Sequence, residues 1–207
     1  LFGEGLVPSA GNFGVEGQRP THAELLEWLS EDFVRSEWSM KSLIRDMLAS
    51  TAYRQASRRG DRDRRRAESV DPNNSLLWRM RLRRVDAEVI RDSLLSLGEN
   101  LDSTMGGEAI PTVTNPDGRV VPRAEGARRR SIYLLVRRAY NPSLLTVFDQ
   151  PVVGTTCSRR HPSAVVSQSL TMMNDAFLFE QSGGLARRVE AMAGPSRDER
   201  VETVFLL

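Results

Sequence analysis

The stretch Asp71-Pro-Asn-Asn-Ser-Leu-Leu-Trp-Arg-Met80, followed by Arg83-Arg-Val-Asp-Ala-Glu-Val-Ile-Arg-Asp92, indicates the fold class of this chain. Its opening is typical of a turn, because Asp and Asn tolerate unusual backbone angles and hydrogen-bond to nearby N–H groups. The apolar residues from Leu76 to Met80 then predict the start of a helix. Asp86 can cap a longer helix, and Gly98 is expected to interrupt or end it. The stretch therefore predicts a largely helical protein.

Two more helices are expected on the N-terminal side of this stretch. Thr21 and Glu24 have the spacing of a capping box, so a helix is predicted to begin there and run to about Ser36. Ser39 can cap a second helix, and the short link between the two predicts a helical hairpin. The second helix has an apolar stripe at helical spacing, made of Met40, Leu43, Ile44, Met47 and Leu48. The charged run from Arg58 to Glu68 has no apolar face and is expected to be a loop or an exposed helical end.

A different pattern appears between residues 110 and 138. The sequence alternates around Asn115-Pro-Asp-Gly118, which predicts a β-hairpin. Ser131-Ile-Tyr-Leu-Leu-Val-Arg137 is rich in β-branched and aromatic residues and is the best strand candidate in the chain. Beyond it the pattern is again helical, with two helices expected on either side of a joint at Asn174-Asp175.

These patterns predict a mainly α fold with a small antiparallel β element, that is, helical hairpins around a short sheet near residues 110–138. We interpret residues 1–207 as one domain fragment. Within it we distinguish an N-terminal helical half (1–103), a β-containing insert (104–138) and a C-terminal helical half (139–207). Leu1 is not Met and the last helical pattern stops at Leu207, so we expect the sequence to be truncated at both ends.

The composition is that of an ordinary globular protein, with 40% hydrophobic and 27% charged residues. No apolar run reaches the ~18 residues of a membrane span, so none is expected in this fragment. The formal charge is only +2, and no nucleic-acid-binding motif is present, so nucleic acid is not an expected partner. Lys41 is the only lysine among 29 cationic residues. We favour base composition and Arg–carboxylate pairing as the reason, with anion recognition as the alternative.

Motifs along nearly the whole chain resemble a domain of unknown function from planctomycetes. It is the C-terminal member of two uncharacterised domains that commonly occur together, often downstream of a cytochrome-c-like domain. Besides the two quoted stretches, the matching motifs include Phe2-Gly-x-Gly-Leu-Val7, Pro20-Thr-His-x-Glu-Leu-Leu-x-Trp-Leu29, Ser50-Thr-Ala-Tyr-Arg-Gln55, Met105-Gly-Gly107, Arg129-Arg-Ser-Ile-Tyr133, Phe148-Asp149, Cys157-x-Arg-Arg160 and Gln168 through Asn174-Asp175.

The resemblance implies a bacterial, multidomain and exported parent protein, located in the periplasm or outside the cell. It implies no activity for particular residues. Covalent haem attachment needs Cys-x-x-Cys-His, whereas this sequence has one cysteine. We therefore expect no cofactor in this fragment, and haem only elsewhere in the parent protein.

Three carboxylates at the start of the predicted central helix are candidates for acid–base chemistry. Glu88 and Asp92 are four residues apart and share a helix face, while Asp86 lies at the cap. Paired carboxylates hydrolyse glycosidic bonds in many enzymes, so one hypothesis is a hydrolase-like domain acting on an anionic polysaccharide. The alternative, which we favour, is an Arg–carboxylate network that fixes the helix against its neighbours.

Cys157 and His161 are the other candidates for chemistry. Cys157 could act as a nucleophile with His161 as its base, but a structural thiol is the favoured interpretation. We expect no metal site, because structural zinc usually takes four Cys or His ligands and the chain has only one Cys and two His. Clustered arginines are candidate anion-binding groups, namely Arg83, Arg84, Arg129, Arg130, Arg159 and Arg160.

Three hypotheses follow for function. We favour an accessory or interaction domain without catalytic activity, whose partners are other domains of the same polypeptide. The first alternative is the hydrolase-like domain, for which an anionic glycan is the partner. The second is a module that docks a cytochrome c domain through its arginines.

Overall fold

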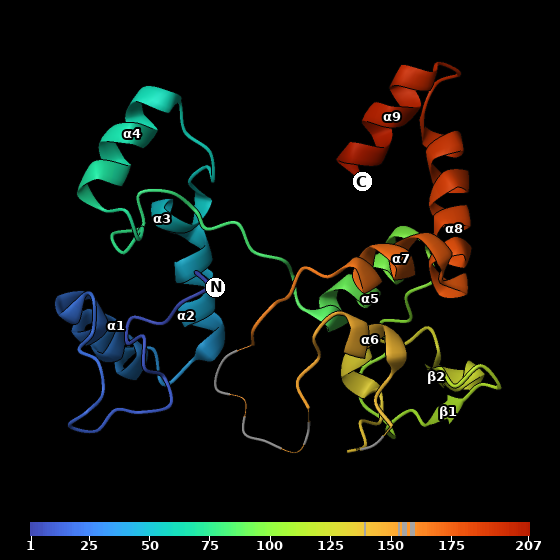
Figure 1. Ribbon diagram of the computed structural model, residues 1–207, viewed down its shortest axis with the longest axis horizontal. Coiled ribbons are helices and arrows are strands. Elements are labelled where there is room, and N and C mark those ends of the chain that lie inside the picture. The colour runs from blue at the N-terminus through green and yellow to red at the C-terminus, as the bar shows by residue number, and fades with distance from the viewer. Residues whose placement is uncertain (139, 153, 155–156, 158–159) are drawn as a thin grey trace. The chain divides into compact units, whose positions relative to one another are not determined.

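The computed structural model describes residues 1–138, 140–152, 154, 157 and 160–207. The chain forms two compact units, Leu1–Arg83 and Arg84–Leu207 (Figure 1). Helices dominate both units, and the second unit also contains a two-stranded antiparallel sheet. The predicted fold class, mainly α with a small antiparallel β element, is confirmed. None of the helices in the described part of the chain has the length and apolar character needed to cross a bilayer.

The first unit begins with an N-terminal loop, residues 1–22, and continues as helices joined by turns. They are α1 (Ala23–Arg35), α2 (Met40–Ala49), α3 (Thr51–Arg54) and α4 (Asp61–Val70). Ser39 caps α2 as predicted, because its hydroxyl accepts a hydrogen bond from the backbone N–H of Ser42 at 3.3 Å. The predicted capping box of α1 is wrong. His22 occupies the cap position, and the Thr21 hydroxyl instead donates to the carbonyl of Leu6 at 3.2 Å.

Residues 71–80 form a turn that is fixed by side chains. The Asp71 carboxylate accepts hydrogen bonds from the backbone N–H groups of Ser75 (2.9 Å) and Leu76 (2.7 Å). The Asn74 side chain accepts from the N–H of Arg79 and donates to its carbonyl. Asn74 and Leu77 both have φ of +54°, which a continuous right-handed helix does not allow. The helix start predicted at residues 76–80 is therefore wrong, whereas the turn before it is confirmed.

The charged run of residues 58–68 contributes most of α4. This helix buries none of its residues, in keeping with the absence of an apolar face. Its first turn contains Asp61 and Asp63, which interact favourably with the positive end of the helix dipole. The prediction of an exposed helical segment is confirmed.

The second unit begins with α5 and ends with α9. Its elements are α5 (Ala87–Leu97), β1 (Thr112–Thr114), β2 (Val120–Pro122), the 3₁₀ helices η1 (Ala124–Gly126) and η2 (Ser131–Tyr133), α6 (Ser143–Val147), α7 (Val166–Asn174), α8 (Ala176–Met192) and α9 (Arg197–Leu206). Helix α5 packs against both α6 and α8, and α9 returns along α8 (Figure 1). The apolar core gathers around α5 and α6 and consists of Ala87, Ile110, Leu134, Leu145 and Phe148.

The predicted hairpin is confirmed in the second unit. Strands β1 and β2 pair with Val113 opposite Val121, and Gly118 has φ of +82° in the connecting turn. The strand predicted at residues 131–137 is wrong, because Ser131–Tyr133 form η2. The parts that resemble a strand are two isolated bridges, a parallel one between Ile110 and Leu134 and an antiparallel one between Arg137 and Tyr140. Leu134 is buried there, whereas Ile132 is 80% exposed.

Helices α7 and α8 meet at the joint predicted from the sequence. Asp175 caps α8, and its carboxylate accepts from the N–H of Phe177 at 2.9 Å. Helix α8 runs unbroken through Gly183 and Gly184. Gly184 is buried against Gly98, the residue at the C-terminal cap of α5, where a side chain would not fit.

The first compact unit ends at Arg83, earlier than the N-terminal helical half that the sequence analysis assigned to residues 1–103. The reason is that α5 packs against α6 and α8 and so belongs to the second unit.

Candidate functional site

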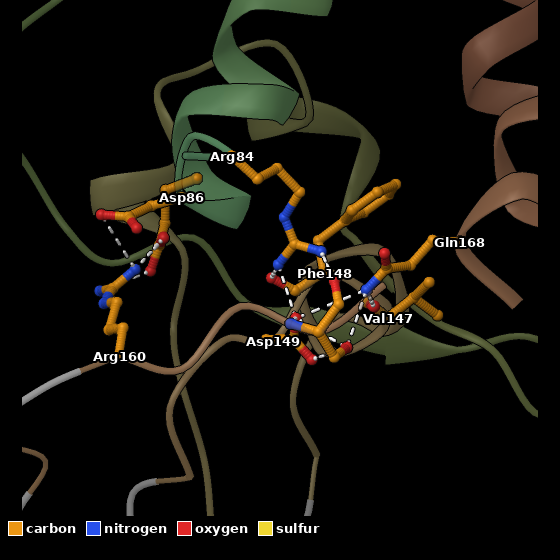
Figure 2. A network of polar contacts seen from close by, with 9 residues as sticks. Arg84, Asp86, Val147, Phe148, Asp149, Arg160 and Gln168 are labelled. Carbon is orange, nitrogen blue, oxygen red and sulfur yellow. Dashed lines mark hydrogen bonds and ion pairs between the residues drawn. The ribbon is translucent and has the colours of Figure 1, made fainter. Parts of the chain in front are cut away.

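Arg84 and Asp149 form the centre of a polar network in the second unit (Figure 2). An Arg84 guanidinium nitrogen donates to Asp149 Oδ2 at 2.6 Å and to the Phe148 carbonyl at 2.9 Å. The other terminal nitrogen donates to the carbonyl of Ser163 at 2.8 Å. The guanidinium carbon also lies 5.5 Å from the centre of the Phe148 ring, at cation–π distance. Arg84 thus fixes the end of α6 to the segment before α7.

Asp149, which follows α6, binds Ser163, which precedes α7, and so joins the two ends of the loop between these helices. Its carboxylate accepts the backbone N–H of Ser163 at 2.7 Å and the Ser163 hydroxyl at 2.8 Å. The hydrogen bond from the Ser163 N–H does most to lower the pKa of Asp149 from 3.8 to about 2. Partial desolvation opposes this effect, and the Arg84 guanidinium and the Ser163 hydroxyl outweigh it. Gln168 of α7 completes the network by donating to the Val147 carbonyl and to the Ser163 hydroxyl, each at 3.1 Å. We call Arg84, Asp149, Ser163 and Gln168 the loop clamp.

The candidate carboxylate Asp86 lies beside the loop clamp together with Arg160 (Figure 2), which also contacts Glu88. Glu88 accepts two hydrogen bonds from Arg160, at 2.6 and 3.2 Å, and Asp86 lies 3.7 Å from the same guanidinium. Burial raises the pKa of Glu88, but the hydrogen bonds and the charge of Arg160 outweigh this effect and leave the pKa below its ordinary value. A carboxyl group with a lowered pKa stays ionised at neutral pH and is poorly suited to donate a proton.

Asp92, the third candidate carboxylate, faces a different set of partners. It accepts the backbone N–H of Ser131 at 2.8 Å and the Ser131 hydroxyl at 2.6 Å. The adjacent Arg91 is only 3% exposed and donates to the carbonyls of Arg129 and Ala127 and to the Ser131 hydroxyl. Burial lowers the pKa of Arg91, against the opposing effect of Asp92. The geometry favours the structural interpretation of these carboxylates, since each is engaged by an arginine or by η2.

The candidate anion-binding arginines separate into two groups. Arg84 and Arg160 are engaged as described, and Arg129 donates to the carbonyls of Thr104 and Gly106 while its guanidinium covers the Tyr133 ring. Arg83 and Arg130 are exposed, and Arg159 lies outside the described residues.

Cys157 and His161, the other candidates for chemistry, are also exposed. The described residues include no group of three or more His, Cys, Asp or Glu side chains arranged to hold a metal ion.

A second candidate site lies in the first unit, among residues that were not predicted to form a site. Residues 1–83, which the structure describes throughout, bury only Asp71 and Asn74, both of which are polar. Helices α1 and α2 bury none of their residues, although each is amphipathic. Such a face is normally covered in a globular protein, because leaving it in water forfeits the main driving force of folding.

Between these helices and the N-terminal loop lies a pocket of about 880 Å³. Its apolar lining consists of Phe2, Leu6, Leu25, Trp28, Leu29, Met47 and Leu77, among others. Polar residues that also line the pocket include Glu4, Thr21, His22, Asp46 and Arg81. Trp28 is 53% exposed, so its ring remains available for contact. A large apolar hollow with a few polar groups has the features of a binding site. We call it the hairpin pocket.

Both units are mainly helical, with a polar network in the second and an apolar pocket in the first. The sequence matches, over residues 1–207, the family described as PSD1, protein of unknown function (DUF1553), and the chain belongs to that family. Comparison with curated proteins and with solved structures gave no match.

Proposed function

We propose that this chain is an accessory domain without catalytic activity, which binds another polypeptide segment through the hairpin pocket. The observation that carries the proposal is the burial pattern of residues 1–83. Two amphipathic helices form a hairpin there and bury none of their residues. Contiguous apolar surface of this kind marks interaction sites in soluble proteins.

The polar network of the second unit supports a structural role for the groups that could have carried chemistry. Glu88 and Asp92 project from one helix, but Arg160 engages the first and Ser131 engages the second. Acid–base hydrolysis needs two carboxyl groups of different pKa facing one substrate. These two carboxylates instead serve separate contacts, and neither lines the hairpin pocket.

The family resemblance supports a further part of the proposal. The chain would belong to an exported bacterial protein, in the periplasm or outside the cell, and the bound segment would come from another domain of that polypeptide. Haem would be held by a separate cytochrome-c-like domain. The complete reading frame tests this context: we expect a signal peptide and an upstream Cys-x-x-Cys-His motif. A complete frame that has neither would overturn it.

The binding proposal is tested by calorimetric titration of the 207-residue chain with an uncharged amphipathic peptide. The peptide has roughly 18 residues, or five helical turns, with Leu at helical spacing and Gln elsewhere. Binding is expected, and a peptide of scrambled order is expected to give no heat. Leu29→Asp, which puts a charge into the pocket, should abolish binding, whereas Val166→Asp on the exposed face of α7 should not. Equal binding of the scrambled peptide, or no binding by either, would overturn the proposal.

A further inference from the structure

The charges around the hairpin pocket specify its partner more closely. Resting on the proposed function, we infer that the segment bound there is a basic amphipathic helix. The inference depends on the secondary structure that the pocket accepts and on the sign of the charges at its rim.

The walls of the pocket favour a helix over an extended strand. Residues 1–83, all of them described, contain no β-strand, so no sheet edge is present to which a peptide strand could be added. The side chains that α1 contributes are Leu25, Trp28 and Leu29, which share one face at helical spacing. Met47 of α2 lines the same pocket. Two helices that present apolar side chains in this way form the groove into which a third helix packs.

Carboxylates border the exposed Trp28. Glu24 precedes it by four residues and Glu31 follows it by three, so both flank it on the same side of α1. Asp46 lines the pocket from α2. Within residues 1–83 none of these three carboxylates has an ion-pair partner, and Glu24, Glu31 and Asp46 are all exposed.

Among the charged side chains that line the pocket, Glu4 and Asp46 are acidic and Arg81 is basic. Arg81 lines the pocket, but its guanidinium forms an ion pair with Glu4. Lys41 and Arg45 project from the other side of α2, away from Met47 and Ser50, as helical periodicity requires. Arg19 is exposed in the N-terminal loop and does not line the pocket. With Arg81 paired to Glu4, Asp46 leaves the lining side chains net negative, and a partner with lysine or arginine beside its apolar face matches this charge.

The test uses three peptides that share one apolar face and carry Lys, Gln or Glu on the polar face. Each is titrated into the 207-residue chain by calorimetry at low salt and at 1 M salt. We expect the Lys peptide to bind about 10-fold more tightly than the Gln peptide, and the Glu peptide to bind most weakly. The advantage of the Lys peptide should disappear at 1 M salt, where the Debye length is ~3 Å.

Charge variants test whether Glu24, Glu31 and Asp46 cause the preference for the Lys peptide. Asp46→Asn, and Glu24→Gln combined with Glu31→Gln, should each weaken the Lys peptide about 3-fold or more while leaving the Gln peptide unchanged. Asp63→Asn on α4 is the matched control, because this carboxylate is exposed and does not line the pocket. Circular dichroism verifies that each variant is folded.

The outcomes separate the two proposals. Equal binding of all three peptides would overturn the charge inference and leave the peptide-binding function standing, whereas no binding of any peptide would overturn both. Tighter binding of the Glu peptide, or equal effects of Asp46→Asn and Asp63→Asn, would also overturn the inference.

Two further results would assign the pocket to another occupant. Self-association of the chain that Leu29→Asp abolishes, and that the Lys peptide does not displace, would assign the pocket to a second copy of this chain. Uptake of a small apolar dye that no peptide displaces would assign it to a small molecule. Either result would overturn the inference.

Discussion

Gly98 and Gly184 hold α5 and α8 in backbone contact, because a methyl group placed on Gly184 would lie 2.5 Å from the carbonyl oxygen of Gly98. Gly98 is restricted in turn by α8, since a methyl group on Gly98 would lie 2.6 Å from Oε1 and 3.1 Å from the backbone oxygen of Gln181. Neither residue has positive φ, so the requirement is for space and not for backbone freedom. The two helices approach this closely only where neither has a side chain.

Gly184→Ala should therefore lower the free energy of unfolding by about 1–3 kcal/mol, the usual cost of overpacking. Gly183→Ala is the matched control, because its methyl group would meet only the end of the Arg187 side chain at 3.8 Å. That substitution should stabilise the helix by roughly 0.5–1 kcal/mol, since alanine has the higher helix propensity. Urea denaturation at 25 °C measures both. If the two variants changed stability in the same direction and by equal amounts, the tight contact would not exist.

Asp149→Asn should lower stability at pH 7 by about 1–2 kcal/mol, because it removes a charge from a partly exposed, hydrogen-bonded site. The folded-state pKa is about 2, below the ordinary value of 3.8. The contribution of Asp149 is therefore fully present above pH 4 and is lost as the pH falls from about 4 to 2. The difference between wild type and variant should shrink from pH 7 to pH 2.5 in urea denaturation. Glu108→Gln, at an exposed residue of the same unit, is the control for removing a carboxylate.

Arg91→Lys should destabilise the second unit by about 2–4 kcal/mol. One ammonium group cannot replace the planar guanidinium that reaches Ser131 and the carbonyls of Ala127 and Arg129, and the site is buried. Arg130→Lys, at an exposed neighbouring residue, should change stability by less than about 0.5 kcal/mol. Thermal denaturation followed by circular dichroism compares them. A loss as small at residue 91 as at residue 130 would refute the role assigned to Arg91.

Asn74→Ala should destabilise the first unit by about 1–3 kcal/mol. It removes both hydrogen bonds to the backbone of Arg79 and places a side chain with poor tolerance of positive φ at +54°. Asn74→Gly separates the two effects, because glycine accepts this backbone conformation but cannot form the bonds. We expect Asn74→Gly to lie between the wild type and Asn74→Ala in chemical denaturation. A glycine variant less stable than the alanine variant would contradict this explanation.

Local signals in the sequence predicted much of the fold. Ser39 as a helix cap, the hairpin around Asn115–Gly118 and the joint at Asp175 each depend on residues within a few positions, so short-range chemistry sufficed. The strand expected at residues 131–137 failed because of a distant residue. Asp92 on α5 accepts both the backbone N–H and the hydroxyl of Ser131, which fixes a 3₁₀ turn where side-chain preference alone favours a strand.

The candidate sites were predicted less completely. The arginine–carboxylate interpretation of Glu88 identified the type of contact, but its partner Arg160 is 72 residues away and could not be assigned from spacing. No role was predicted for Asp149, Ser163 or Gln168, because their contacts depend on how the chain returns from α6 to α7. The apolar stripe of α2 was visible in the sequence. What sequence could not show is that this stripe lacks a covering element within residues 1–83.

The loop clamp also bears on how this family can diverge. Asp149 and Ser163 join the two ends of the segment between them, so the contact between α6 and the start of α7 does not depend on the length of that segment. Lengthening such a segment costs folding free energy only through loop-closure entropy, about 0.6 kcal/mol for each doubling of its length. We therefore expect insertions or a grafted foreign sequence to be accepted within residues 150–159, before the Arg160 that engages Glu88, without altering the helices on either side.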